Sequence, residues 1–507
     1  MTMKTLLRTA TAGVVVALTM SACSEPAMET QAEAARLEIT TASAESRAAL
    51  ESALNEWFNV FITRATAEAD RAVTLDSTFG LARAVRANLQ ASLSPEEQEA
   101  ELDRAVADAA GASQGEFLLA SSIRAQALGR TEEARALADV AVRLVPGDPN
   151  VAYMRAMVIP AAERLEPLRE VTVRFPDFAP AFNILAYSQW AANDTAGALQ
   201  SVQRYVELMP DHPNSHDSYA ELLQFTGRHD EAIEHYNQAT ALDAEYVEGY
   251  AGVGEVESIR GNAEAARAAF TQAAELSTGA TRFNYLAIIA ASHLIDGTPA
   301  DAVREMMVVA REAEQQNQPA VAATIHRNAA LLEAVFGNNA TAATHLSRAG
   351  QLGNADAPVQ HRYSAIIHAL AGRHAEADVA AARFDELAAA GNAVQRQNAH
   401  EVRAVLAAVR QDVAGARTHL EQAGPSLLGR ALLAQTLQAG GSTEEAQQLK
   451  DEVLRSNTVT YFDFLAREKR GRCSPVGSPS RDGAALPREA LRRLHHGGSV
   501  RARALAR

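Results

Sequence analysis

The sequence predicts an all-α solenoid of about ten antiparallel helix pairs. The first observation behind this prediction is a set of small and aromatic residues in the middle of the chain, which recur at an interval of about 34 residues. A fixed interval of this size indicates one helical hairpin copied along the chain, each copy burying its apolar face on its neighbours. The second is composition: hydrophobic residues make up 47% of the chain but aromatic residues only 5%. Alanine dominates the other hydrophobic residues, and it favours closely packed helices over a sheet.

The columns that keep this interval have distinct roles in a hairpin. Small residues let the two helices approach, glycine or asparagine tolerates the left-handed conformation of the turn, and an aromatic residue fills the gap between hairpins. In chain order the columns are Ala186, Ala220 and Gly254 on the first helix; Asn193, Gly227 and Gly261 at the turn; and Ala198, Ala232 and Ala266, followed by Tyr236 and Phe270, on the second helix.

In these columns the chain resembles the tetratricopeptide repeat family, whose unit is a helix–turn–helix of about 34 residues. The resemblance implies a right-handed superhelical solenoid. It is strictest over residues 179–278 and looser over the rest of a solenoid expected to span 49–278. From 279 to 468 the period drifts, and we expect degenerate helical repeats there. Ser277, Thr278 and Gly279 interrupt the pattern where the two segments meet.

The N-terminus predicts export from the cytoplasm. Lys4 and Arg8 precede a short apolar run that ends in Ser21, Ala22 and Cys23. This order is typical of a signal peptide, here residues 1–22, and the run is too short to span a bilayer. Two alternatives stay open for its processing, a lipoprotein mechanism at Cys23 and conventional cleavage after Ala22.

The residues before Cys23 resemble a bacterial lipoprotein lipobox, although Met20 stands where that family usually has leucine. The resemblance implies lipidation of the Cys23 thiol and a membrane anchor. Ser24 is not the aspartate that retains such proteins in the inner membrane, so the expected location is the periplasmic side of the outer membrane. Residues 23–48 would form the tether.

The C-terminal segment 469–507 has a different composition. Residues 470–507 contain nine arginines but only two acidic residues, Asp482 and Glu489. Three interpretations remain open: a basic arm for an anionic surface, a disordered terminus without a role, and an out-of-frame extension of the coding sequence. We favour a tail without function.

Composition and motifs argue against catalysis, cofactors and nucleic acid. The net charge of −15 disfavours binding to nucleic acid. The sequence contains no phosphate-binding loop, nucleophile elbow or metalloprotease motif. His212, His216, His229 and His235 are the densest titratable group, but Pro213 interrupts the spacing that a helical metal site needs. We therefore expect neither a metal nor a cofactor, and no enzyme.

The family resemblance also implies a binding groove on the first helix of each hairpin. Carried over by position, its residues are Asn183, Tyr187 and Trp190, then Asp217, Glu221, Gln224 and Phe225, and then Glu248, Glu255 and Ser258. The cations by which some family members clamp a chaperone's terminal carboxylate are mostly missing. An acidic groove with three aromatic side chains would suit an extended or helical peptide with basic and apolar residues.

The first functional hypothesis is therefore a non-catalytic scaffold of the cell envelope that binds peptides or proteins in this groove. An alternative is an envelope enzyme or glycan-handling protein with its site in the degenerate half, residues 283–468. A third hypothesis is a purely structural spacer. For any single groove residue, a role in packing between repeats competes with a role in binding.

Overall fold

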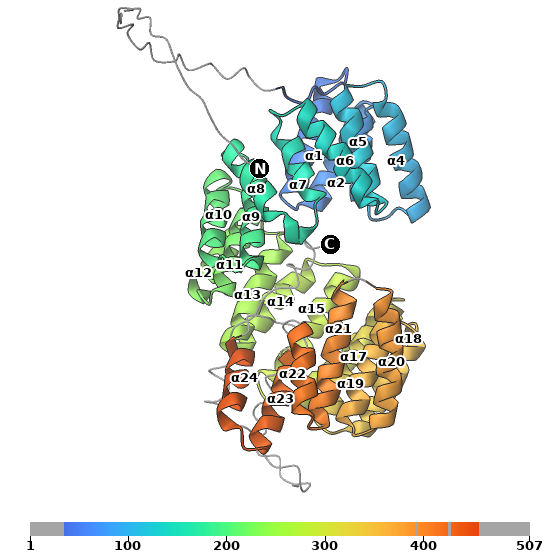
Figure 1. Cartoon of the computed structure of the whole chain (residues 1–507), viewed down its shortest axis with the longest axis vertical. Coiled ribbons are helices and arrows are strands. Elements are labelled where there is room, and N and C mark those ends of the chain that lie inside the picture. Colours follow the sequence, from blue (N-terminus) through green and yellow to red (C-terminus); the bar gives the residue numbers. More distant parts are fainter. Residues whose placement is uncertain (1–34, 392, 424–426, 456–507) are drawn as a thin grey trace, which may run out of the picture.

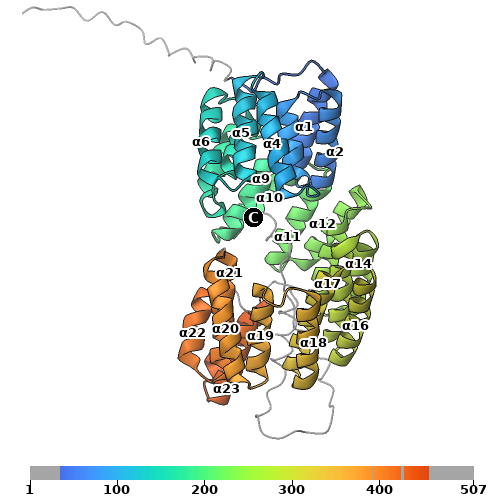
Figure 2. The same cartoon turned by 90° about the vertical axis from the view of Figure 1, so that its right-hand side faces the viewer.

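The computed structural model describes residues 35–391, 393–423 and 427–455. Within these ranges the chain forms 24 α-helices, two short 3-10 helices and no strand. Consecutive α-helices pack against each other in pairs, so the 24 helices form twelve hairpins, slightly more than the ten expected. Figures 1 and 2 show these hairpins stacked in chain order, which confirms the all-α solenoid.

Four hairpins precede the regular segment. Their helices are α1 (Ala44–Phe58), α2 (Ile62–Leu75), α3 (Gly80–Leu89), α4 (Pro95–Ala109), α5 (Gln114–Ala127), α6 (Thr131–Leu144), α7 (Pro149–Met157) and α8 (Leu165–Arg174). The regular segment then contributes α9 (Ala179–Ala191), α10 (Thr195–Leu208), α11 (Pro213–Phe225), α12 (His229–Leu242), α13 (Val247–Arg260) and α14 (Ala263–Glu275).

Five further hairpins complete the described chain. Their helices are α15 (Gly279–Ala291), α16 (Pro299–Gln315), α17 (Pro319–Val335), α18 (Asn339–Leu352), α19 (Pro358–Leu370), α20 (His374–Ala389), α21 (Ala393–Val409), α22 (Val413–Gln422), α23 (Leu427–Ala439) and α24 (Thr443–Arg455). None of the helices in the described ranges is both long and apolar enough to cross a membrane.

The turns of the regular segment adopt the conformation that the sequence predicts. Asn193, Gly227 and Gly261 have φ values of 61°, 78° and 78°, all in the left-handed region that glycine and asparagine tolerate best. Each ends the first helix of a hairpin and allows the chain to reverse into the second helix.

Close packing between and within the hairpins depends on glycine beside the aromatic column. Tyr236 and Phe270 are 1% exposed. A Cβ atom at Gly252 would lie 2.3 Å from the Tyr236 ring, and one at Gly254 would lie 2.8 Å from the Phe270 ring. Both distances are well inside van der Waals contact. Only glycine at these two positions lets α13 approach both rings.

The drift of the period after residue 278 has a simple geometric cause. Helices α9 to α14 are all 13 or 14 residues long, whereas α16, α17 and α21 have 17 residues and α20 has 16. Three or four added residues make about one helical turn. The buried face of each helix therefore stays in phase while the repeat interval grows.

Residues 35–43 form an extended segment that crosses the first hairpins before α1 begins. The backbone N–H of Leu37 donates to Asp148, and that of Thr40 donates to Glu116 at 2.9 Å. The Ser113 hydroxyl donates to the Glu38 carbonyl at 2.6 Å. The end of the expected tether is thus bound to the solenoid. The signal peptide, Cys23 and the segment 469–507 lie outside the described residues.

Candidate functional site

The predicted groove residues lie on the first helices of three consecutive hairpins. Asn183, Tyr187 and Trp190 are on α9, and their spacing of four and three residues places them on one face of that helix. Asp217, Glu221 and Gln224 on α11 repeat this spacing, as do Glu255 and Ser258 on α13, because one hairpin is copied at a fixed interval. The two other predicted residues, Phe225 on α11 and Glu248 on α13, stand outside these columns.

Polar contacts connect these faces from one hairpin to the next. The Tyr187 hydroxyl on α9 donates to Glu221 Oε2 on α11 at 2.5 Å. On α11, Gln224 Nε2 donates to Glu255 Oε2 on α13 at 3.2 Å. The Tyr236 hydroxyl in turn donates to Gln224 Oε1 at 2.8 Å. The structure therefore brings together four of the predicted residues in a ladder that runs across α9, α11 and α13.

An aromatic pair lies at the end of the same face. The rings of Trp190 and Phe225 stack with their centroids 5.3 Å apart and an interplanar angle of 29°. Both side chains are half-buried. Aromatic side chains with one accessible edge are frequent contact residues at protein interfaces. This pair connects α9 to α11 and would form the apolar part of the predicted groove.

Burial separates the predicted residues into two groups. Asn183, Asp217, Glu221 and Gln224 are at most 4% exposed, whereas Tyr187, Glu248 and Glu255 are half-buried. Burial, and then the neighbouring Glu221 carboxylate, raises the pKa of the Tyr187 hydroxyl well above its usual value. Tyr187 therefore stays a hydrogen-bond donor at every physiological pH.

Asn183 is the most unusual of these residues. Its side chain is 1% exposed, yet neither its Nδ2 nor its Oδ1 atom has a hydrogen-bond partner. Leaving a buried polar group without a partner costs about 1–3 kcal/mol. Asn183 lies one helical turn before Tyr187 on α9, and its amide is covered by the surrounding protein.

Sequence reasoning missed a contact between the first hairpin and the regular segment. We call residues 59–64, at the turn between α1 and α2, the corner. The Phe61 ring stacks on Tyr246 with centroids 5.4 Å apart and meets the edge of His212 at 4.7 Å. Arg64 forms an ion pair with Asp243 at 2.5 Å. These contacts join segments that are far apart in the chain, since Arg64 and Asp243 are separated by 179 residues.

A buried hydrogen-bond chain continues from the corner into the regular segment. The Tyr205 hydroxyl donates to Asn59 Oδ1 at 2.7 Å and accepts from Asn214 Nδ2 at 3.1 Å. The Tyr246 hydroxyl donates to Asn214 Oδ1 at 3.3 Å. No local sequence motif predicts that these residues are partners, because each is an isolated polar residue in its own helix or loop.

Burial of His212 has an electrostatic consequence at the corner. The residue precedes α11 as its N-cap, and both ring nitrogens are buried without a partner. Burial, with a smaller contribution from the Arg64 charge, lowers the pKa of His212 to about 4. His212 is therefore neutral near pH 7 and packs as an aromatic ring.

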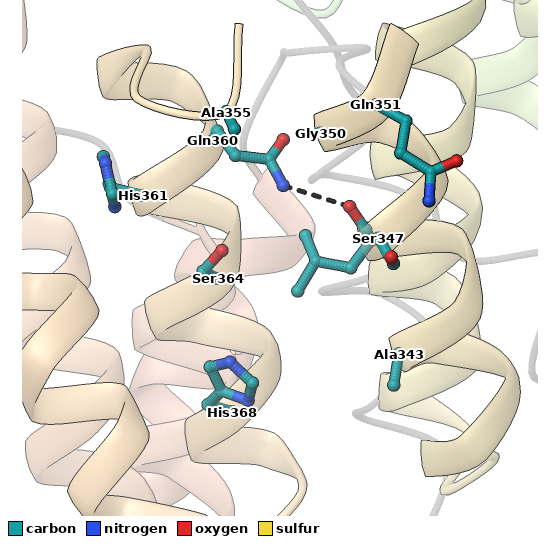
Figure 3. A pocket seen from close by; sticks show the side chains of 10 residues that line it. Ala343, Ser347, Gly350, Gln351, Ala355, Gln360, His361, Ser364 and His368 are labelled. Carbon is teal, nitrogen blue, oxygen red and sulfur yellow. Dashed lines mark hydrogen bonds between the residues drawn. The ribbon is translucent and has the colours of Figure 1, made fainter. Parts of the chain in front are cut away.

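A pocket of about 470 Å³ lies in the degenerate half, between α18 and α19. Figure 3 shows Gln360 reaching from α19 towards α18, where its Nε2 donates to the Leu346 carbonyl at 3.0 Å. Ser364 and His368 also line the pocket. Among the residues described around it, no hydrogen bond joins a serine hydroxyl to a histidine ring.

Metal-ligating side chains are dispersed over the helices. In the part of the chain that the structure describes, no three His, Cys, Asp or Glu side chains lie close enough together to hold a metal ion. The histidines that lie close together in the sequence occupy different places in the structure. His212 lies at the corner, and His216 and His235 face each other between α11 and α12.

Comparisons with known proteins agree with this architecture. The tetratricopeptide repeat model matches residues 214–246, which is the hairpin of α11 and α12. No curated protein matches the chain. Among solved structures, the chain is similar to the MamA protein, with 17% identity over 32% of this chain and 91% of that one and a TM-score of 0.29.

Two other solved structures are similar at the same level. One is YrrB, described as a TPR protein with an unusual peptide-binding site, with 18% identity over 32% of this chain and 85% of that one and a TM-score of 0.27. The other is a tetratricopeptide repeat protein from Parabacteroides merdae, with 15% identity over 51% of this chain, 98% of that one and a TM-score of 0.37. The chain thus contains a tetratricopeptide repeat in the hairpin of α11 and α12, one of its twelve stacked hairpins.

Proposed function

We propose that this protein is a non-catalytic scaffold of the bacterial cell envelope that binds a peptide or protein in the groove formed by α9, α11 and α13. Tetratricopeptide repeats are protein-interaction modules, and this supports the general kind of partner. A lipid on Cys23 would hold the scaffold at the outer membrane. The groove assignment and the location are the parts of the proposal that need testing.

The observation that carries the groove assignment is the Trp190–Phe225 stack, whose half-buried rings offer an apolar surface across α9 and α11. The Tyr187–Glu221 contact lies next to it on the same two helices. Stacked helices hold these groups in place before binding, so little conformational entropy is lost when a partner arrives.

The partner chemistry follows from the carboxylates. Four of the side chains predicted to form the groove are acidic, namely Asp217, Glu221, Glu248 and Glu255. A partner segment with one or two basic residues and an apolar side chain would complement them. Because charged contacts are screened, binding should weaken as salt is raised from about 0.05 to 0.5 M.

The test is an affinity capture from envelope extracts of the native host with the double variant Trp190→Ala/Glu221→Gln. We expect the partners held by the unaltered protein to be lost. The matched control is Val173→Ala/Glu207→Gln, on the second helices α8 and α10, where Val173 is 82% exposed. An unchanged set of partners in the double variant would refute the groove.

The envelope location has a separate test. Globomycin blocks the peptidase that processes lipoproteins, so it should cause an unprocessed precursor to accumulate. The Cys23→Ala variant should be insensitive to the drug and should leave the membrane fraction. Normal processing of the unaltered chain in globomycin would instead favour conventional cleavage after Ala22.

A further inference from the structure

Three hairpins contain a pair of histidines that face each other across the two helices. The pairs are His216 with His235, His326 with His345, and His400 with His419, and in each pair the residues are 19 apart in sequence. The Nδ1 atoms are separated by 3.0, 3.2 and 3.2 Å. Six of the fourteen histidines of the chain thus take part in this one recurring contact.

The three pairs occupy the same position in their hairpins. The first histidine of each pair lies four residues before a fully buried alanine of the first helix, which is Ala220, Ala330 or Ala404. The second histidine directly precedes a buried residue of the second helix, which is Tyr236, Leu346 or Leu420. The contact recurs at the same position in α11/α12, α17/α18 and α21/α22. It is therefore a feature of the repeated hairpin and not of one local loop.

The Nδ1 separations identify what lies between the rings. Nitrogens 3.0–3.2 Å apart are at the distance of an N–H···N hydrogen bond. A tetrahedral metal with bonds of about 2.0–2.1 Å would hold them about 3.3–3.4 Å apart and would need further ligands. No third ligand converges in the described residues. Each neutral pair therefore shares one proton between its two Nδ1 atoms.

The tautomers of the first pair can be assigned from its surroundings. His216 Nε2 lies 2.9 Å from the carbonyl oxygen of Pro210, which can only accept. His216 therefore carries its proton on Nε2 and presents a bare Nδ1. The hydrogen bond between the rings must then be donated by His235 Nδ1. A proton added at His216 would have to enter this contact.

One added proton leaves one charged and one neutral ring, which can still share an N–H···N hydrogen bond. A second added proton charges both rings and converts the attractive contact into a repulsive one. Two imidazolium rings would oppose two N–H groups at about 3 Å in a partly dehydrated site, where like charges repel more strongly than in water. Burial accordingly lowers the pKa of His235, His326, His345 and His419 below the ordinary value, and the facing ring lowers it further for all of these except His345.

Charged groups around each pair have opposing effects. Every pair is faced by one arginine, which disfavours the added proton, and by carboxylates, which favour it. These groups are Arg228, Glu231 and Glu234 for the first pair; Arg348, Glu314 and Glu333 for the second; and Arg403, Asp385 and Asp412 for the third. Tyr219 also packs against His235, with ring centroids 4.6 Å apart.

We propose that the histidine pairs make these three hairpins acid-sensitive, so that a second added proton in a pair separates the first helix from the second at that point. A histidine that is protonated less readily in the folded protein than in the unfolded chain stabilises the folded state when it is neutral. This contribution to the free energy of unfolding is complete above the ordinary histidine pKa of about 6.5 and is lost as the pH falls below that value. The hairpins α9/α10 and α13/α14 contain no histidine in the described structure and keep their packing. The proposal does not depend on what the groove binds.

Hydrogen exchange of the full chain, resolved by hairpin, tests this proposal. The protein is compared at pH 7.5 and 5.5 with EDTA present, after correction for the intrinsic exchange rate. We expect protection to fall by roughly tenfold in the three hairpins with pairs and to stay constant in α9/α10 and α13/α14. His212, with a pKa of about 4, remains neutral at pH 5.5. A uniform loss across all five hairpins would overturn the proposal.

Substitution separates the pairs from other histidines. In the triple variant His235→Gln/His345→Gln/His419→Gln, the glutamine amide can donate the same hydrogen bond but never becomes charged. The loss of protection at pH 5.5 should then shrink several-fold. The control triple variant His293→Gln/His361→Gln/His374→Gln removes as many histidines outside the pairs and should behave as the unaltered protein.

A single variant guards against a triple variant that fails to fold. His235→Gln should remove the acid response of α11/α12 alone and leave those of α17/α18 and α21/α22 unchanged within the same molecule. An equal response of all three hairpins in this variant would overturn the proposal. So would a loss of protection at pH 7.5 caused by EDTA alone, because it would mean that the pairs hold a metal.

Discussion

The regular segment, α9 to α14, and the degenerate half, α15 to α24, solve the same packing problem with different residues. In the regular segment the aromatic rings of Tyr236 and Phe270 enter gaps beside glycine and alanine. In the degenerate half one continuous core rich in alanine and leucine extends to α24 and is built on longer helices. Repeat regularity therefore reflects constant helix length, whereas the solenoid itself requires only that the buried face of each helix points towards its neighbours.

Successive hairpins are joined by the same kinds of contact in both regions. The regular segment has the Tyr187–Glu221 hydrogen bond and the Arg260–Asp230 ion pair. The degenerate half has the Tyr363–Asn328 hydrogen bond and the Arg403–Asp385 ion pair. The Trp190–Phe225 stack of the regular segment is the feature that leads us to expect a binding groove there.

The largest expected effect comes from removing an aromatic residue of the regular segment. Phe270→Ala should cost about 3–5 kcal/mol, because the helices around it cannot collapse fully into the space. The corresponding change in the degenerate half, Leu346→Ala, removes a smaller side chain that is 7% exposed, and should cost about 2–3 kcal/mol. Hydrogen exchange of each segment measures both values. Equal costs would remove the distinction between the two cores.

Acid provides the second test, at the corner that joins the first hairpin to the regular segment. Because the pKa of His212 is lowered to about 4, its neutral packing is fully stabilising above about pH 6.5 and is lost as the pH falls towards 4, at a cost of about 2–3 kcal/mol. His212→Asn keeps an N-cap for α11 and should flatten this dependence. The measurement is the melting temperature between pH 7 and 4, and an unchanged slope would contradict it.

A smaller effect is expected at the ladder itself. Tyr187→Phe removes the hydroxyl that donates to Glu221 and should destabilise the segment by about 1–2 kcal/mol, as expected for a hydrogen bond to a charged acceptor. Denaturation curves of the variant and of Tyr250→Phe, whose hydroxyl bonds an exposed loop carbonyl, provide the comparison. Identical stabilities of the two variants would show that the ladder contributes nothing to the packing of α9 on α11.

The smallest effect is expected on the surface of the degenerate half. Arg417 pairs with Glu445, and their side chains are 48% and 39% exposed. Such pairs are screened by water and contribute about 0–1 kcal/mol. Arg417→Ala should therefore change the melting temperature of the protein by no more than about 2 °C. A larger loss would mean that surface ion pairs, and not the alanine-rich core, hold this half together.

The sequence was sufficient to predict the hairpins and their turns. The columns Asn193, Gly227 and Gly261 predict turns, and all three have the left-handed conformation. The spacing on α9 and α11 places Tyr187 and Glu221 on facing sides, where they form a hydrogen bond. These successes share one cause, since helical periodicity and the repeat interval fix both the face of a helix and its neighbour.

Contacts between hairpins far apart in sequence could not be predicted in this way. Phe61 meets Tyr246 only because superhelical curvature brings the corner onto the regular segment, and curvature accumulates from small rotations that no motif encodes. The histidine pairs had a detectable signal, the 19-residue spacing of His216 and His235. A search for histidines on one face of a single helix does not find this spacing, because the two rings come from two helices.

Photocrosslinking from the groove tests the central claim most directly. Benzoylphenylalanine replaces Phe225, beside Trp190 in the groove, or Val173 on the outer helix α8, in the full chain expressed in its native host. We predict that a protein partner is captured from position 225 and not from position 173, and that Glu221→Gln reduces this capture. Capture of the same proteins from both positions, or from position 173 alone, would contradict a binding groove on α9, α11 and α13.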